Sequence, residues 1–316
     1  MHIVILDYAT LGYDLDLSGA EKYGTVTKYE NSTKEEAAQR IKDADAIIVN
    51  KIKMTRDVLE NASKLKIICE TATGYDNIDI EYCKERGILV SNTPGYSSSC
   101  VAQVTVSMVC SLFTHLKEYR ECVDSGRYTK NGVPNSLVPI YNELYGKTWG
   151  IIGYGNIGKA VGRVAEAFGC RVIVNKRTPE EGCVCVDLDT ILKESDIISI
   201  HCPLTTQTKN MIDERAISLM KKDVVLVNVA RGGVWDEEAI AKAVEEGRIG
   251  GIGCDVFTKE PFGTDHPFYR LLGKDNVCLT PHMAWGSFES RTRCFNIILS
   301  NIEAYLNGNP INIINK

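Results

Sequence analysis

The 316-residue sequence lacks an apolar run of the ~18 residues that a membrane span requires. It opens with a strand-like segment rather than with the basic and apolar regions of a signal peptide. It also lacks an excess of basic residues, since its net charge is −5. That balance gives no reason to expect nucleic acid or an anionic membrane as a partner. We therefore expect a cytoplasmic protein that binds neither.

Cysteine patterns that hold metals are also missing. Twelve cysteines are scattered along the chain, many of them in apolar segments. Only Cys183 and Cys185 lie close together, and their spacing is too short for a zinc-binding C-x-x-C pair, with no histidine beside them. We predict reduced core thiols and no metal site.

What the sequence does contain is a regular alternation of strand-like and helix-like segments. In the first half, strands are predicted at His2–Leu6, Thr25–Tyr29, Ala46–Asn50, Lys66–Cys69 and Ile88–Val90. Helices are predicted after Ser32, Thr55 and Asn77, the first with a capping box at Ser32–Glu35. In the second half, strands are predicted at Thr148–Ile152, Arg171–Asn175, Asp196–Ile200, Val224–Val229, Gly250–Asp255 and Val277–Leu279. Helices should start near Asn156, Asp187, Asp213 and Asp236. This pattern favours doubly wound parallel sheets, and the length suits about two domains.

Three further segments lie outside this alternation of strands and helices. A long helix is predicted from Cys100 to Tyr119 after a break at Pro94–Ser99. The polar stretch Asp124–Tyr145 is predicted to be an extended arm, and Ser287–Leu306 to be a final amphipathic helix.

A glycine motif follows the first strand of the second half. The spacing G-x-G-x-x-G is formed by Gly153, Gly155 and Gly158 at a strand–turn–helix junction. In this context the first glycine permits the turn, the second lets a pyrophosphate approach, and the third lets the helix pack on the strand. We predict a dinucleotide site whose phosphate turn consists of Gly153, Tyr154, Gly155, Asn156, Ile157 and Gly158.

The end of the next strand bears on the choice of cofactor. NAD sites place an acidic residue there, roughly 20 residues past the glycines, for the ribose 2′-hydroxyl. Here Lys176, Arg177 and Thr178 occupy that place, and no acid occurs before Glu180. These side chains would attract a 2′-phosphate, so NADP is favoured over NAD. The alternative is a solvated basic turn in a protein that uses NAD.

Ionisable residues follow the last strands of the second half. Arg231, Glu260 and His282 each come after a different predicted strand. A histidine can exchange the proton of a hydroxyl, a carboxylate can orient that histidine, and a guanidinium can hold a substrate carboxylate. Each residue alone could be an ordinary loop residue, but their shared position predicts a proton-transfer site.

The sequence resembles the D-isomer-specific 2-hydroxyacid dehydrogenase family over nearly its whole length. The motifs are Gly153–Gly158, His201–Thr205, Asn228–Gly233, Asp255–Pro261 and Pro281–His282. Asn50–Lys51, Ala72–Asp79 and Pro281–Trp285 look like the glycerate dehydrogenase/hydroxypyruvate reductase branch. The resemblance implies two Rossmann-like domains with the active site in the cleft between them. Residues 1–96 and 287–316 would bind substrate, residues 97–286 would bind NAD(P), and residues 100–145 would form a homodimer.

The resemblance also implies roles for particular residues. His282 would be the acid/base, Glu260 would keep it protonated, and Arg231 would bind the oxoacid. Lys51 and the backbone of Thr73 and Gly74 would contact the substrate, and the alternative for Lys51 is a solvated lysine at a strand end. Asp255 would contact the nicotinamide, with a turn cap as the alternative. Further cofactor contacts are expected from His201, Cys202, Pro203, Thr208, Val229, Ala230 and Ala284. His2, His115 and His266 have no motif support.

The predicted activity is reduction of a small 2-oxoacid, hydroxypyruvate or glyoxylate, to the D-2-hydroxyacid. Two alternatives remain. One is another D-2-hydroxyacid dehydrogenase, for example of the D-lactate type. The other is a non-catalytic protein that senses dinucleotides.

Overall fold

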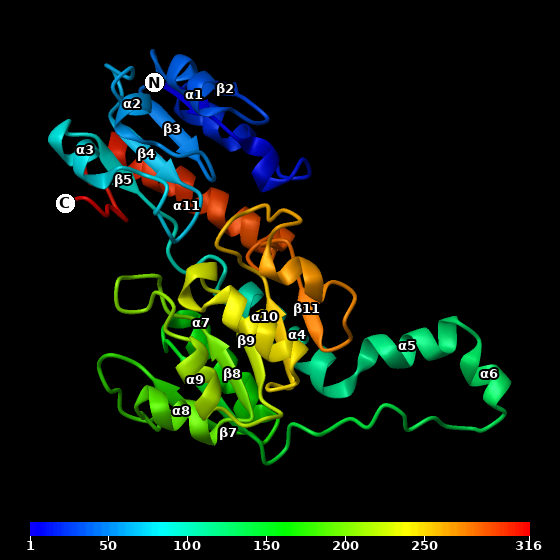
Figure 1. Ribbon diagram of the computed structural model, residues 1–316. Coiled ribbons are helices and arrows are strands. Elements are labelled where there is room, and N and C mark those ends of the chain that lie inside the picture. Colours follow the sequence, from blue (N-terminus) through cyan, green and yellow to red (C-terminus); the bar gives the residue numbers. More distant parts are fainter. The chain divides into compact units, whose positions relative to one another are not determined.

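Two parallel β-sheets form the framework of the chain in a computed structural model that describes residues 1–316 (Figure 1). Each sheet belongs to its own compact unit. The first unit comprises Met1–Ser97 and Gly286–Lys316, and the second comprises Ser98–Trp285. The predicted class, two α/β domains built on parallel sheets, is confirmed.

The first unit has a five-stranded sheet of order β2-β1-β3-β4-β5. Its strands are β1 (His2–Ile5), β2 (Thr25–Lys28), β3 (Ala46–Val49), β4 (Ile67–Glu70) and β5 (Leu89–Ser91). Its helices are α1 (Lys34–Arg40), α2 (Arg56–Leu59), α3 (Ile80–Glu85) and the long α11 (Phe288–Leu306). β3 and β4 are buried along their whole length, as expected for parallel strands that are covered on both faces.

The capping box of α1 lies one residue later than predicted. Thr33, not Ser32, is the N-cap, and it exchanges hydrogen bonds with Glu36. The Ser32 hydroxyl instead donates to the carbonyl of Leu6. Two adjacent hydroxyl residues offered equivalent local patterns, and the tertiary contact of Ser32 decides between them.

The second unit has a six-stranded sheet of order β11-β10-β9-β8-β6-β7. Its strands are β6 (Thr148–Ile152), β7 (Arg171–Asn175), β8 (Ile197–Ile200), β9 (Val225–Asn228), β10 (Gly251–Cys254) and β11 (Val277–Leu279). Its helices include α4 (Ser98–Thr114), α7 (Asn156–Ala167), α8 (Leu188–Glu194), α9 (Glu214–Leu219) and α10 (Glu237–Glu245). The helix starts predicted near Asp187, Asp213 and Asp236 are confirmed, because these residues are the N-caps of α8, α9 and α10 and accept backbone hydrogen bonds there.

The prediction of a single helix from Cys100 to Tyr119 is wrong. The α4 helix ends at Thr114, His115 takes a left-handed conformation with φ 49°, and α5 (Leu116–Asp124) continues at an angle of 63°. No glycine or proline marks this break in the sequence. No single helix of the chain is long and apolar enough to cross a membrane, and only this bent pair reaches the length together.

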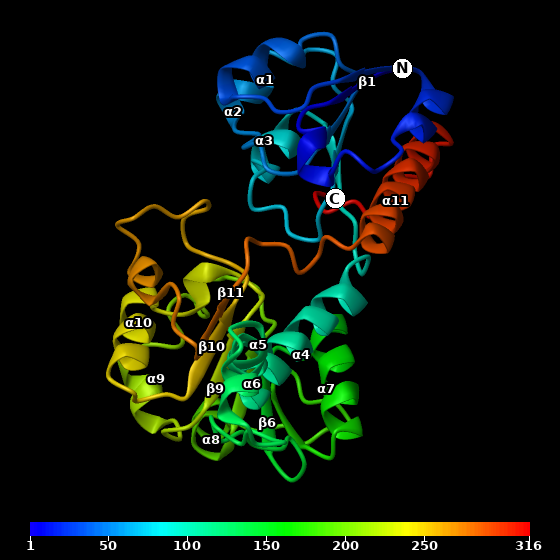
Figure 2. The same cartoon turned by 90° about the vertical axis from the view of Figure 1, so that its right-hand side faces the viewer.

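The predicted arm is partly helical. It contains α6 (Arg127–Asn131) and then runs without regular structure to β6. Figure 1 shows α5, α6 and the following segment projecting from the rest of the second unit, and Figure 2 views this projection from its end.

Candidate active site

The carboxyl ends of the six strands of the second unit share one edge of its sheet, because all neighbouring pairs are parallel. The predicted site residues follow these ends in sheet order: His282 after β11, Asp255 and Glu260 after β10, Arg231 after β9, His201 after β8, Gly153 after β6 and Lys176 after β7. The proton-transfer residues therefore occupy one half of the edge. The glycine turn and the basic residues occupy the other half.

His282 and Glu260 form a direct pair. The distance from His282 Nδ1 to Glu260 Oε2 is 2.6 Å. Glu260 also accepts a hydrogen bond from the backbone N–H of Phe257 at 2.9 Å, which fixes the carboxylate. A carboxylate at Nδ1 holds that nitrogen as the protonated one and leaves Nε2 as the atom that faces a reactant. This arrangement suits an acid/base histidine.

Asp255 braces the turn that carries His282. One carboxylate oxygen accepts from the Thr280 hydroxyl at 2.5 Å and from Met283 N at 2.9 Å, and the other accepts from Ala284 N at 2.9 Å. His282 itself has a left-handed φ of 52°, which is uncommon outside glycine. Burial raises the pKa of Asp255, and these hydrogen bonds together with the His282 charge oppose the shift. These hydrogen bonds make Asp255 a cap of the turn, which is the alternative to a contact with the nicotinamide.

Arg231 is presented by the turn after β9. The buried Asn228 accepts from Ala230 N at 3.0 Å and donates to the Arg231 carbonyl at 2.9 Å, so one amide side chain closes the turn. The next residue must be glycine: a Cβ on Gly232 would lie 2.1 Å from the Phe257 carbonyl carbon. The segment that leads to Glu260 therefore packs directly against the backbone beside Arg231.

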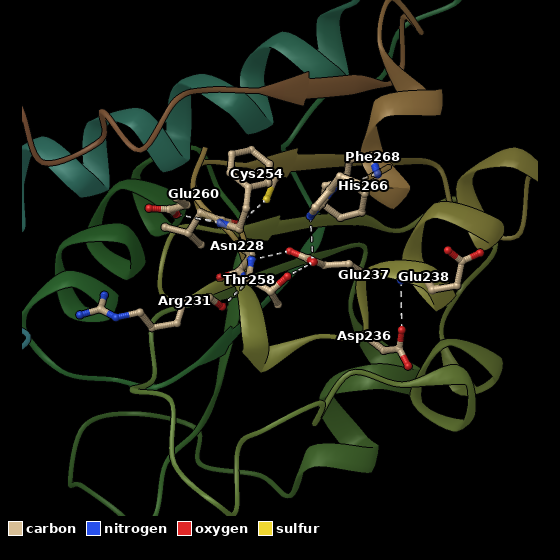
Figure 3. Close-up of polar contacts among 12 residues, drawn as sticks. Asn228, Arg231, Asp236, Glu237, Glu238, Cys254, Thr258, Glu260, His266 and Phe268 are labelled. Carbon is tan, nitrogen blue, oxygen red and sulfur yellow. Dashed lines mark hydrogen bonds and ion pairs between the residues drawn. The ribbon is translucent and has the colours of Figure 1, made fainter. Parts of the chain in front are cut away.

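A buried cluster behind this segment was missed from the sequence. Glu237 accepts from the Thr258 backbone N–H at 2.9 Å and from the Thr258 hydroxyl, and its Oε2 lies 3.0 Å from His266 Nε2 (Figure 3). His266 Nδ1 accepts from Phe268 N at 3.1 Å, which makes Nε2 the protonated nitrogen. His266 has no motif support in the sequence, but it contacts the Glu237 carboxylate that holds Thr258, two residues before Glu260.

The glycine turn has the geometry that a pyrophosphate needs. Gly153 has a φ of 91°, and a Cβ there would lie 2.6 Å from Cys202 N. A Cβ on Gly158 would lie 2.3 Å from the Gly153 carbonyl oxygen, so α7 packs closely on the turn. A Cβ on Gly155 would have no neighbour within 4 Å, and no side chain caps α7. The open second glycine and the uncapped helix end fit an anionic group.

The residue after β8 is neutral. His201 Nε2 lies 3.0 Å from the Ser199 hydroxyl, while its buried Nδ1 has no hydrogen-bond partner. Burial lowers the pKa of His201 to about 3, so this histidine cannot serve as a proton donor at neutral pH. Burial likewise raises the pKa of Cys202 to about 11.

Other predicted cofactor residues line the same edge. The Thr208 hydroxyl donates to the Pro203 carbonyl at 2.6 Å and closes an exposed turn. The remaining residues are buried or half-buried, apart from the exposed Asn156: Tyr154, Asn156, Ile157, Val229, Ala230 and Ala284. Their contacts with a cofactor stay predictions.

Lys176 is paired at the far end of the edge. Its ammonium group contacts Glu180, which also contacts the Lys159 ammonium at 2.5 Å. Arg177 and Thr178 are exposed. The acid that pairs with Lys176 is thus Glu180, four residues later along the chain.

The predicted substrate residues of the first unit lie at the carboxyl edge of its own sheet. Lys51 is exposed, and its backbone N–H donates to the buried Asp7 carboxylate at 2.7 Å. The backbone N–H groups of Thr73 and Gly74 make no hydrogen bond within the chain, so they can donate to an outside acceptor. No group of three or more metal-ligating side chains gathers in the chain, and all twelve cysteines are free thiols.

The fold and this edge define a Rossmann-type α/β protein whose strand ends carry a paired histidine and glutamate. Residues 106–284 match the sequence model of the D-isomer specific 2-hydroxyacid dehydrogenase, NAD binding domain. The chain belongs to the D-isomer-specific 2-hydroxyacid dehydrogenase family, an oxidoreductase family, as the sequence predicted.

Comparisons with individual proteins agree. The chain is 36% identical to the hydroxypyruvate reductase of Blautia hydrogenotrophica over the full length of both. It is similar to the D-lactate dehydrogenase of Aquifex aeolicus, solved with NAD and lactic acid, at 32% identity and a TM-score of 0.88, covering 100% of this chain and 99% of that one. It is also similar to the acyclic imino acid reductase Bsp5, solved with NADPH and D-Arg, at 33% identity and a TM-score of 0.86, covering 99% and 100%.

Proposed function

We propose that the protein is an NAD(P)-dependent D-2-hydroxyacid dehydrogenase that reduces hydroxypyruvate or glyoxylate and can run in reverse. The observation that carries this proposal is the His282–Glu260 pair at the strand-end edge that also bears the glycine turn. A bound nicotinamide cofactor supplies the hydride. The first unit is assigned to substrate and the second to cofactor.

The chain's own residues handle the proton and the substrate charge. His282 Nε2 donates a proton to the keto oxygen during reduction and removes it during oxidation, while Glu260 stabilises the charged imidazole. Arg231 holds the substrate carboxylate and polarises the carbonyl. Lys51 and the backbone N–H groups of Thr73 and Gly74 add contacts to the carboxylate.

The test is steady-state reduction of hydroxypyruvate, with glyoxylate and pyruvate beside it, using NADPH and then NADH. We expect rapid turnover of hydroxypyruvate with preference for NADPH, because Lys176, Arg177 and Thr178 follow β7. Preference for pyruvate would favour the D-lactate alternative. Because one solved relative reduces imino acids, the panel also includes each oxoacid with an amine. Tight cofactor binding without turnover of any substrate would support the sensor alternative and contradict the proposal.

The protein is further proposed to be a cytoplasmic homodimer. The homodimer is supported by residues 116–146, which comprise α5 and the predicted arm and are here called the arm together. Several of its large apolar side chains are exposed: Leu116, Val123, Val133, Leu137, Val138, Ile140, Tyr141 and Tyr145. Such clusters on one projecting segment are typical of association surfaces.

A further inference from the structure

Glu180 lies between two lysines that come from different elements. Its Oε1 accepts from Lys159 Nζ at 2.5 Å, and its Oε2 pairs with Lys176 Nζ. Lys159 belongs to α7, directly after the glycine turn, and Lys176 directly follows β7. One carboxylate thus bridges α7, which begins in the glycine turn, and the end of β7.

The two lysines favour the charged form of the bridging carboxylate. Hydrogen bonds from Lys159 and then from Lys176 lower the pKa of Glu180 to about 2. Lys176 is also well covered, with a side chain that is 20% exposed. The Lys176 ammonium group is therefore already paired with an internal anion, which it shares with Lys159.

Two ammonium groups that share one anion would also suit a phosphate monoester. A phosphate offers three terminal oxygens and up to two negative charges to the same donors. It cannot share the place with Glu180, because like charges at contact distance repel. An unphosphorylated ribose differs, since its hydroxyl groups can donate to the carboxylate where it stands.

The loop that carries Glu180 is anchored at both ends. Val174 N donates to the Val184 carbonyl and Val186 N donates to the Val174 carbonyl, both at 2.9 Å, so the loop base is fixed beside β7. Cys183 Sγ donates to the Glu180 carbonyl at 3.2 Å, which holds the backbone of Glu180 as well. Only the side chain of Glu180 has to rotate to release the two lysines.

We propose that Glu180 sets the choice between NADP and NAD by occupying the Lys159–Lys176 anion site and competing with the 2′-phosphate. This inference rests on the proposed function in one respect, namely that a dinucleotide lies along this edge. The basic residues alone favour NADP. With Glu180 between the two lysines, a 2′-phosphate binds there against the electrostatic repulsion of that carboxylate.

The test uses two nucleotides that differ only by the group in question, adenosine 2′,5′-bisphosphate and adenosine 5′-monophosphate. Their dissociation constants are measured by calorimetry for the wild type, for Glu180→Gln and for Glu181→Gln. Glu181 is the matched control, because it is an exposed glutamate of the same loop that forms no ion pair. Circular dichroism verifies that each variant is folded.

Glu180→Gln should raise the preference for the bisphosphate about tenfold, as expected from removing one charge near a surface phosphate. Glu181→Gln should leave the preference near that of the wild type. In the double variant Glu180→Gln/Lys176→Met the gain should disappear. The ratio of kcat/KM for NADPH over NADH should follow the same order.

The outcomes separate the inference from the function on which it rests. Binding of both nucleotides with an unchanged or lowered preference in Glu180→Gln would overturn the role of Glu180 alone. Binding of neither nucleotide to any variant would overturn the dinucleotide site, and with it both the proposed function and this inference.

Discussion

At the residue scale, the proposed chemistry depends on a single imidazole. Replacing His282 by Gln keeps a polar side chain but removes the group that exchanges protons. We expect His282→Gln to lower kcat by ~10²–10⁴, the usual contribution of a general acid/base, with cofactor binding retained. Steady-state kinetics and cofactor titration measure both quantities. His2→Gln, in the first strand, is the control, and undiminished turnover in His282→Gln would remove His282 from the mechanism.

Asp255 offers a second prediction at this scale, because its carboxylate accepts three hydrogen bonds from the turn around His282. Asn at this position would turn an N–H₂ group toward one of those donors. Asp255→Asn should lower the free energy of unfolding by about 1–3 kcal/mol, the cost of an unsatisfied buried group. It should also lower kcat, since His282 loses its support. Urea unfolding and kinetics test this, and Thr280→Val, which removes one donor, should have the smaller effect. Wild-type values for both quantities in Asp255→Asn would contradict the bracing role.

At the element scale, the strand-end rule explains why part of the site could be predicted from the sequence. Arg231, Glu260 and His282 each follow a recognisable buried strand, and parallel strands bring their ends to one edge. The Glu237–His266 pair could not be predicted, because its partners come from separate segments whose contact is set by packing. The break at His115 was equally hidden, since its left-handed backbone occurs at a residue with no local signal for it.

The end of β4 carries a prediction about pH. Glu70 is fully buried, with Asn77 donating to its Oε2 at 3.0 Å and no partner for its Oε1. Burial raises the pKa of Glu70 well above its usual value, and the Asp7 charge raises it further. Above the pKa of the unfolded chain the folded state holds a proton that the unfolded state has lost, so stability falls as pH rises.

We therefore expect the free energy of unfolding to fall between about pH 5 and about pH 8 by more in the wild type than in Glu70→Gln. Gln keeps the shape and the acceptor for Asn77 but does not titrate. Urea unfolding at the two pH values measures the difference. Parallel pH profiles for the two proteins would show that Glu70 is already ionised in the folded state.

At the scale of the whole molecule, the arm of residues 116–146 exposes several large apolar side chains to solvent. Ile140 is 81% exposed and Leu137 is 68% exposed, on a segment that projects from the rest of the second unit (Figure 1). Burying one such side chain against a second copy would contribute about 1.5–3 kcal/mol. Ile140→Asp would instead bury an unpaired charge in the proposed dimer and leave the isolated chain unaffected.

Ile140→Asp should therefore weaken self-association by at least about 100-fold while the fold is retained. Sedimentation equilibrium gives the association constant, and circular dichroism reports the fold. Leu272→Asp is the matched control, because Leu272 is an exposed leucine of the same unit outside the arm. A wild-type protein that stays monomeric at micromolar concentration would contradict the homodimer. If the two substitutions weaken the dimer equally, the interface lies elsewhere. An interface formed by the arm would be weakened by Ile140→Asp and not by Leu272→Asp.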